Sequence, residues 1–476
     1  MKYGFLTVAA AIPSVRVADI EYNLEEIKRI IGEAERQHVE VVVFPELSIT
    51  GYTCQDLFRQ RTLIDGAELA VLSLLEFTMR KDIIVIVGAP IEAGNLLLNC
   101  AVVIQQGRLL GVIPKTFLPN YSEFYEKRWF ASAQDLHDTP LCYAGEDVLL
   151  TARRQIFHTY EDARFAVEIC EDVWSPNPPS TQLALSGADI VFNLSASDEL
   201  IGKHSYLIDL LKQQSARNIC GYVYSGSGYG ESTQDVVYGG NALIFENGRL
   251  IKQSQRFSIE PQLVVSQIDI DRLRAERRSN STYVNAQQAL RPQEQGYVCI
   301  TNEAMLPENQ KEEWQLLRHV DAHPFIPKDE DMMASCEEIL SIQTLGLCKR
   351  IAHTHAKTVV IGISGGLDST LALLVCVRAF DKLGIDRSQI VAVTMPGMGT
   401  TGRTHRNALS LMEALGVSIH EISIAKAVAQ HFADIGHDAH VHDTTYENAQ
   451  ARERTQILMD LSNEYGGLVI GTGDLS

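Results

Sequence analysis

The chain of 476 residues is too long for one ordinary hydrophobic core, so its length predicts two domains. Hydrophobic residues at 45% and charged residues at 21% are typical of soluble globular proteins, and no apolar run approaches the roughly 18 to 20 residues that span a bilayer. With 60 acidic and 41 basic residues the formal net charge is -19, which repels phosphate backbones and anionic surfaces, so we expect no nucleic-acid and no membrane partner.

The first half of the chain alternates segments of helical and strand periodicity. The apolar run at residues 1–13 suits a first strand better than a signal peptide. Apolar residues every three to four positions from Ile20 to Ala34 predict a helix. Gln106-Gly107 and Asn247-Gly248, each between apolar runs, predict hairpins. This mixture favours an α/β layered sandwich, with strands expected at 39–44, 83–87, 101–104, 109–113, 165–169, 190–193 and 222–224.

The second half begins after a break in the apolar pattern. Residues 272–327 are rich in Arg, Gln and Pro and are interpreted as a linker or surface arm, which gives domains at 1–271 and 328–476. Helical and strand-like segments then alternate, which predicts a doubly wound parallel α/β sheet. The expected strands are 358–363, 390–395 and 468–471, and the expected helices run through 339–351, 369–380, 409–415 and 446–465. The nine cysteines are scattered and form no C-x-x-C pair, which indicates reduced thiols in a cytoplasmic protein.

Three polar residues stand at the ends of apolar strands in the first half, where open α/β sheets place their chemistry. They are Glu46, Lys115 and Cys170. A thiol nucleophile needs a base for its proton and a donor for the oxyanion of the tetrahedral intermediate. Glutamate supplies the base, lysine the oxyanion partner and cysteine the nucleophile. The neighbouring Glu171 and Asp172 are expected to raise the pKa of the thiol unless Lys115 outweighs them.

The sequence around these residues resembles the three signatures of the nitrilase (carbon–nitrogen hydrolase) family, in order. The resemblance rests on Phe44-Pro45-Glu46-Leu47, on Pro114-Lys115-Thr116-Phe117 with Glu123-Phe124-Tyr125-Glu126, and on Glu168-Ile169-Cys170-Glu171-Asp172. It implies an N-terminal nitrilase-like α/β/β/α sandwich. Within that family the segment is most similar to the glutaminase domain of NAD synthetases.

That resemblance also implies which residues bind glutamine. Tyr121 and Ser197 match residues that hold the substrate, and Lys203 matches a position where some relatives carry arginine. Lysine offers a point charge in place of a bidentate fork for the α-carboxylate.

A glycine turn follows the first strand of the second domain and leads directly into a helix. Glycine amides and serine hydroxyls there can surround one anion at the helix N-terminus, and Asp368 can hold Mg²⁺ on the phosphates. The absence of a G-K-[ST] sequence excludes an ordinary Walker loop. The predicted ATP site consists of Gly362, Ile363, Ser364, Gly365, Gly366, Leu367, Asp368 and Ser369.

This S-G-G-x-D-S loop resembles the pyrophosphate loop of the N-type ATP pyrophosphatases, which cleave ATP to AMP and pyrophosphate. The later segments 445–454 and 471–476 resemble NAD synthetases in particular. By that resemblance Asn448 contacts deamido-NAD and Thr472 contacts ATP.

Together the resemblances imply that glutamine is hydrolysed through a thioester at Cys170 and that the ammonia amidates deamido-NAD, with ATP and Mg²⁺. The expected partners are small-molecule substrates, with a homo-oligomer at full length. Two alternatives stay open: an ATP-dependent amidotransferase with another acceptor, and an amidase beside a non-catalytic nucleotide-binding module. The family continues past the point where this sequence stops, so we expect a fragment that hydrolyses glutamine and makes no appreciable NAD.

Overall fold

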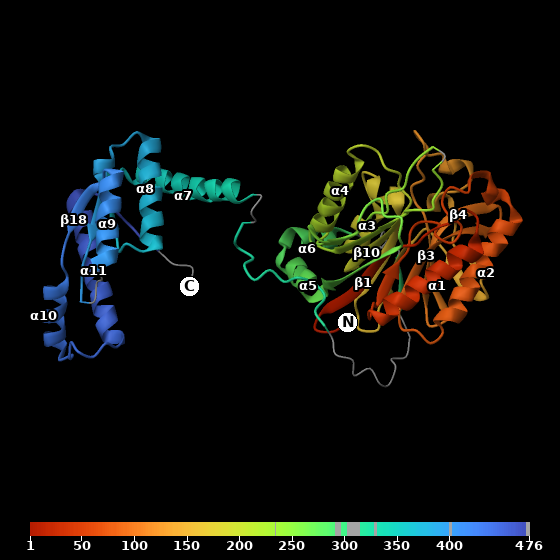
Figure 1. Ribbon diagram of the computed structural model, residues 1–476, viewed down its shortest axis with the longest axis horizontal. Coiled ribbons are helices and arrows are strands. Elements are labelled where there is room, and N and C mark those ends of the chain that lie inside the picture. Colours follow the sequence, from red (N-terminus) through yellow and green to blue (C-terminus); the bar gives the residue numbers. More distant parts are fainter. Residues whose placement is uncertain (234, 291–296, 302–314, 328–330, 399–401, 473–476) are drawn as a thin grey trace. The chain divides into compact units, whose positions relative to one another are not determined.

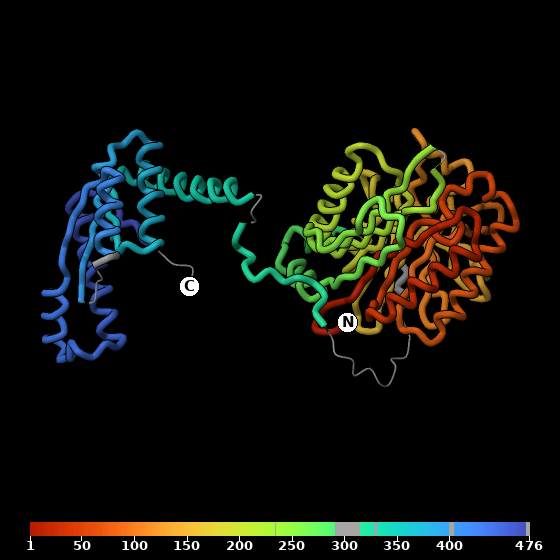
Figure 2. Tube along the Cα trace, in the orientation of Figure 1, coloured from red at the N-terminus to blue at the C-terminus, as the bar shows by residue number. Residues whose placement is uncertain are grey.

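A computed structural model describes the chain except for residues 234, 291–296, 302–314, 328–330, 399–401 and 473–476. The chain forms two compact units, Met1–Val320 and Asp321–Ser476. Figure 2 traces the backbone, coloured from red at the N-terminus, in the first unit, to blue at the C-terminus, in the second. In the part of the chain that is described, no helix combines the length and hydropathy that crossing a bilayer requires.

The described part of the first unit contains two large mixed sheets and a two-stranded antiparallel sheet of β6 (Thr139–Tyr143) and β7 (Glu146–Leu150). One sheet has six strands in the order β14-β1-β2-β3-β4-β5, and the other has seven in the order β13-β12-β11-β10-β9-β8-β15. The first sheet comprises β14 (Gln262–Asp269), β1 (Phe5–Ile12), β2 (Val41–Val43), β3 (Ile84–Ala93), β4 (Leu96–Gln105) and β5 (Arg108–Pro114). The second comprises β13 (Arg249–Gln253), β12 (Ala242–Glu246), β11 (Gly221–Gly226), β10 (Ile190–Ser195), β9 (Arg164–Ile169), β8 (Arg154–His158) and β15 (Tyr297–Thr301). Both predicted hairpins are present, as β4-β5 and β12-β13.

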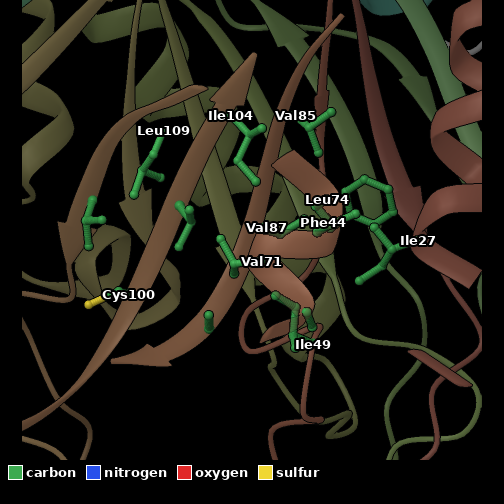
Figure 3. Packing of buried hydrophobic residues seen from close by; sticks show 14 of the residues in the cluster. Ile27, Phe44, Ile49, Val71, Leu74, Val85, Val87, Cys100, Ile104 and Leu109 are labelled. Carbon is green, nitrogen blue, oxygen red and sulfur yellow. The ribbon is translucent and has the colours of Figure 1, made fainter. Parts of the chain in front are cut away.

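The two sheets pack face to face, and helices cover their outer faces. Alternate residues of β1 show this division: Val8 contributes to the core between the sheets, whereas Ala9 packs under the helices. Helices α1 (Ile20–Arg36) and α2 (Arg61–Thr78) cover the first sheet through residues such as Ile27 and Leu74, which Figure 3 shows against strand residues. Helices α3 (Pro179–Leu185) and α4 (Lys203–Arg217) cover the second. The predicted α/β/β/α sandwich is therefore confirmed.

Part of the segment interpreted as a linker folds onto this unit as α5 (Ile270–Ser279) and α6 (Ser281–Ala289) (Figure 1). Arg277, only 8% exposed, donates to the carbonyl oxygens of Ala188 and Ile219 at 2.8 and 2.9 Å. The Tyr283 hydroxyl donates to the Ala184 carbonyl oxygen at 2.9 Å. Polar side chains of this segment thus donate hydrogen bonds to backbone carbonyl groups that are buried beneath it.

The second unit has a four-stranded parallel sheet in the order β18-β17-β16-β19. Its strands are β16 (Val359–Gly362), β17 (Ile390–Thr394), β18 (Ser418–Glu421) and β19 (Leu468–Ile470). Helices α7 (Met332–Thr354), α8 (Leu367–Leu383) and α9 (Gly402–Leu415) pack on one face, and α10 (Ala425–Ile435) and α11 (Thr444–Tyr465) on the other. The doubly wound architecture is confirmed, and the strand order reverses at β16, where such sheets bind ligands.

Candidate active sites

The first unit brings the three predicted catalytic side chains into one buried cluster. Glu46 follows β2, Lys115 follows β5 and Cys170 follows β9, and their exposures are 1%, 1% and 5%. β2 and β5 belong to one sheet and β9 to the other, so the cluster forms where the ends of both sheets meet. Chain connectivity alone does not predict this meeting point, because the residues are 55 or more positions apart in the sequence.

Lys115 lies between two carboxylates. Its Nζ donates to Glu46 Oε1 at 2.6 Å and to Glu126 Oε1 at 2.7 Å. Burial acts to lower the pKa of Lys115, but Glu126 and then Glu46 outweigh it and hold the pKa well above its usual value. The lysine is therefore a cation at neutral pH, as an oxyanion partner must be.

Glu46 is held from both sides. Oε1 also accepts from Asn99 Nδ2 at 2.7 Å, and Oε2 accepts from the Ala196 amide at 2.9 Å. Three hydrogen bonds to its two oxygens, one of them from Lys115, therefore fix the orientation of the Glu46 carboxylate.

Glu126 and Tyr52 complete the cluster, and sequence reasoning gave neither of them a role. The Tyr52 hydroxyl donates to Glu126 Oε1 at 2.7 Å. Burial raises the pKa of Glu126 to about 7, against the opposing effect of the Lys115 cation. The signal was present in the sequence, since Glu126 lies within the Glu-Phe-Tyr-Glu run, but only the fold shows that this run passes Lys115.

Cys170 occupies a sharp turn at the start of a short 3-10 helix, Cys170–Trp174. Its φ of +46° is unusual for a residue with a side chain and marks local backbone strain. Burial and then the Glu46 carboxylate raise the pKa of the thiol well above its usual value, while Lys115 lowers it. The thiol therefore rests protonated, and its attack requires a base.

Asp172 was expected to raise the pKa of the thiol, but its carboxylate is occupied by backbone amides. It accepts from the amides of Phe117 and Ile169 at 2.8 and 3.0 Å, and burial raises its pKa to about 8. It thereby ties the segment after Lys115 to the strand that ends at Cys170.

The residues predicted to bind glutamine lie near this cluster with partners of their own. The Tyr121 hydroxyl donates to Glu171 Oε1 at 2.8 Å. Lys203 Nζ donates to Asp198 Oδ1 at 2.6 Å and lies 5.4 Å from the centre of the Phe124 ring. Ser197 is half-buried beside Asp198. Lys203 is thus neutralised by a buried carboxylate before any substrate binds.

A cavity of about 230 Å³ opens beside Tyr52. Five of its lining residues are aromatic, and both charged ones, Glu123 and Asp235, are acidic. It is lined by Tyr52, Thr53, Gln55, Glu123, Phe124, Tyr125, Trp129, Ser232, Asp235, Val236 and Tyr238. A cavity with aromatic walls and a few polar groups beside the catalytic cluster is suited to binding a small polar molecule.

In the second unit the loop after β16 has the predicted form. Gly365 has φ +83°, and a Cβ there would lie 2.3 Å from the Thr404 carbonyl oxygen, so only glycine fits. The Ser364 and Ser369 hydroxyl oxygens lie 3.2 Å apart, and the Gly366 amide donates to Ser364 Oγ at 3.3 Å. α8 begins at Leu367 without a side-chain cap, which leaves its first turn open to an anion.

The remaining predicted nucleotide-binding residues differ in their surroundings. Ile363 is 2% exposed and packs in the core, so its side chain supports the loop from below. Asp368 is exposed in the first turn of α8, and within the described residues no ion pair engages it, which suits a carboxylate that holds a cation. Thr472 is exposed after β19, and Asn448 lines an open cavity of about 460 Å³ along α11. Gly473–Ser476 lie outside the described residues.

Comparison with known proteins gives matches over both units. Residues 7–278 match the carbon-nitrogen hydrolase family and residues 339–476 match the NAD synthase family. The chain is 37% identical over 490 residues to the glutamine-dependent NAD(+) synthetase of Mycobacterium leprae, covering 99% of this chain and 70% of the relative. That of Aquifex aeolicus is 29% identical over 479 residues, covering 99% and 75%. The structure of the Acinetobacter baumannii glutamine-dependent NAD+ synthetase in complex with ADP matches with a TM-score of 0.48 and 25% identity, covering 99% and 75%.

Proposed function

The chain belongs to the glutamine-dependent NAD(+) synthetases, a family of ligases, and on that premise we propose that Cys170, Glu46 and Lys115 hydrolyse glutamine in the first unit. The observation that carries the assignment is the buried cluster in which Lys115 bridges Glu46 and Glu126 beside a protonated thiol. A base, a cation and a nucleophile in one buried place are what amide hydrolysis through a thioester requires.

The steps follow from the contacts. Glu46 takes the thiol proton as the Cys170 sulfur attacks the side-chain carbonyl carbon of glutamine, and the Lys115 ammonium stabilises the resulting oxyanion. Collapse breaks the carbon–nitrogen bond, and the departing ammonia takes its proton from Glu46. Water then attacks the thioester, Glu46 accepts its proton, and glutamate leaves as the thiol is restored.

Tyr121, Ser197 and Lys203 are proposed to orient the amino-acid end of glutamine. Lys203 Nζ lies 5.4 Å from the centre of the Phe124 ring, and Asp198 limits its freedom through a hydrogen bond of 2.6 Å. Because Asp198 already balances the charge of Lys203, the ammonium group is expected to act on the α-carboxylate of glutamine mainly as a correctly placed hydrogen-bond donor.

We further propose that the loop from Gly362 to Ser369 binds ATP and that Asp368 holds Mg²⁺. The support is the chemistry of the residues: amide groups at the start of α8, two serine hydroxyls and one exposed carboxylate. Mg²⁺ there would neutralise charge on the phosphates as pyrophosphate leaves. Thr472 is proposed to contact ATP and Asn448 deamido-NAD, whose nicotinate carboxylate becomes the amide.

The test of the first site is glutamate release from glutamine by the parent chain and by Cys170→Ala. The parent should release glutamate, and the variant should lose this activity with its fold retained. Glutamate release by a folded Cys170→Ala protein at the parent rate would contradict the proposal.

A further inference from the structure

Glu231 is a buried carboxylate that takes no part in the proposed chemistry. It lies between β11 and β12 and is 4% exposed. Its Oε2 accepts from the Tyr52 amide at 3.0 Å, and its Oε1 accepts from the Thr53 amide at 3.0 Å and from Thr53 Oγ1 at 2.7 Å. Three donors from one turn, 178 or more positions away in the sequence, therefore converge on this carboxylate.

The Glu231 segment and the Tyr52 turn both pack closely against the chain at Val15 and Val17. Gly230 has φ +103°, and a Cβ there would lie 2.0 Å from the Val15 carbonyl oxygen. Gly51 has φ +83°, and a Cβ there would lie 3.3 Å from Glu231 Oε1. Both glycines have a positive φ that residues with a side chain rarely adopt, so the close packing beside Glu231 and the Tyr52 turn depends on glycine at these positions.

The Tyr52 turn carries a side chain that reaches the catalytic cluster. The Tyr52 hydroxyl and Lys115 Nζ both donate to Glu126 Oε1, each at 2.7 Å. A shift of the turn would therefore remove one of the two bonds that orient Glu126, and with it the alignment of Lys115 toward Glu46.

We propose that Glu231 is a positioning residue of the glutaminase site, which holds Tyr52 against Glu126 and so keeps Lys115 aligned between its two carboxylates. The inference rests on the proposed function of the first unit. It assigns a kinetic role to a residue that contacts neither the nucleophile nor the base.

The role has a signature in the pH dependence of the reaction. Glu126 faces Lys115, Glu46 and Tyr52, and its charge also acts on Cys170. The bond from Tyr52 lowers the pKa of Glu126 against the effect of burial, so weakening that bond raises the pKa further. If the ionised form of Glu126 orients Lys115, the acidic limb of activity moves to higher pH.

The experiment compares glutamine hydrolysis by the parent, Glu231→Gln, Tyr52→Phe and the double variant, with kcat and KM measured from pH 5 to 9. Glu231→Gln should lower kcat about tenfold, change KM less than threefold and move the acidic limb upward. Because Glu231 acts through Tyr52, the double variant should lose little beyond Tyr52→Phe alone. Multiplied effects, or an acidic limb that stays in place, would overturn the proposal.

Glu246→Gln is the matched control. Glu246 is also a buried clamp, 5% exposed, that accepts from the Asp269 amide at 2.7 Å and from Arg318 Nη2 at 2.9 Å, away from the cluster. Glu246→Gln should lower the free energy of unfolding without moving the acidic limb of the pH–activity profile. If that limb moved as far in Glu246→Gln as in Glu231→Gln, the specific role of Glu231 would be overturned.

Two further variants keep the result decisive. If Glu231→Gln does not fold, Thr53→Val removes one donor to Glu231, and an unchanged pH limb in that variant would overturn the proposal. Cys170→Ala reports on the proposed function itself. Activity in Cys170→Ala would overturn the assignment of the site, whereas an inactive Cys170→Ala with an unaffected Glu231→Gln would overturn only the positioning role.

Discussion

Gly88 in β3 packs directly against the backbone of Glu46 and Leu47, the segment that carries the proposed catalytic base. A Cβ on Gly88 would lie 2.1 Å from the Leu47 amide nitrogen and 2.9 Å from the Glu46 carbonyl carbon. Both neighbours are backbone atoms, so no side-chain rotation can relieve the contact. Gly88→Ala must displace either β3 or the segment that carries Glu46.

The expected cost has two parts. Overpacking in a well-filled core costs about 1–3 kcal/mol in the free energy of unfolding. Displacement of a catalytic group by ~1 Å costs about 100-fold in rate, so glutaminase kcat should fall by tenfold or more. Urea denaturation followed by tryptophan fluorescence measures the first part, and glutamate release measures the second.

Gly32→Ala provides the matched control. Gly32 lies inside α1, and the nearest atom to its added Cβ would be Arg36 Nη1 at 3.8 Å. Alanine there should raise the free energy of unfolding by about 0.5–1 kcal/mol and leave kcat unchanged. A Gly88→Ala protein with the stability and kcat of the parent would refute this reasoning.

Three further outcomes are expected. Cys170→Ala should abolish glutamate release yet leave whatever ammonia-driven NAD formation the parent shows, because the thiol serves only the first site; parallel assays with glutamine and ammonium check this. Burial raises the pKa of Glu126 from 4.5 to about 7, so its contribution to stability is complete below about pH 4.5 and is lost as pH rises through 7. The free energy of unfolding of the parent should therefore fall by on the order of 3 kcal/mol between pH 5 and pH 8, as measured by urea unfolding. Glu126→Gln should remove this part of the fall, because glutamine does not titrate. Asp368→Ala should abolish ATP-dependent pyrophosphate release while glutamine hydrolysis continues, and pyrophosphate release at the parent rate would show that the loop is wrongly assigned.

The sequence was most informative where apolar periodicity and turn residues agree. All seven strands expected between residues 39 and 224 are present, and β16 and α8 flank the glycine loop as predicted. The hairpins are predicted by glycine and asparagine in their turns, and the strands by runs of β-branched residues. Both signals depend only on neighbouring residues, so the sequence alone shows them.

What depends on long-range packing could not be predicted. Residues 272–327 were interpreted as a linker or surface arm because the apolar pattern breaks there. The contacts of α5 are to distant backbone carbonyls, which no local pattern shows. Likewise, Tyr52 and Glu126 meet across 74 positions, and Glu231 reaches Tyr52 across 179. The short strand β18, with its alternate residues exposed, gave no continuous apolar run.

The identity of the nucleophile is the central claim, and covalent labelling tests it most directly. A diazoketone analogue of glutamine should alkylate the parent chain once, and peptide mass spectrometry should place the label on Cys170. Excess glutamine should protect the thiol, and Cys170→Ala should take up no label. A label on any other residue, or equal labelling of Cys170→Ala, would contradict the account.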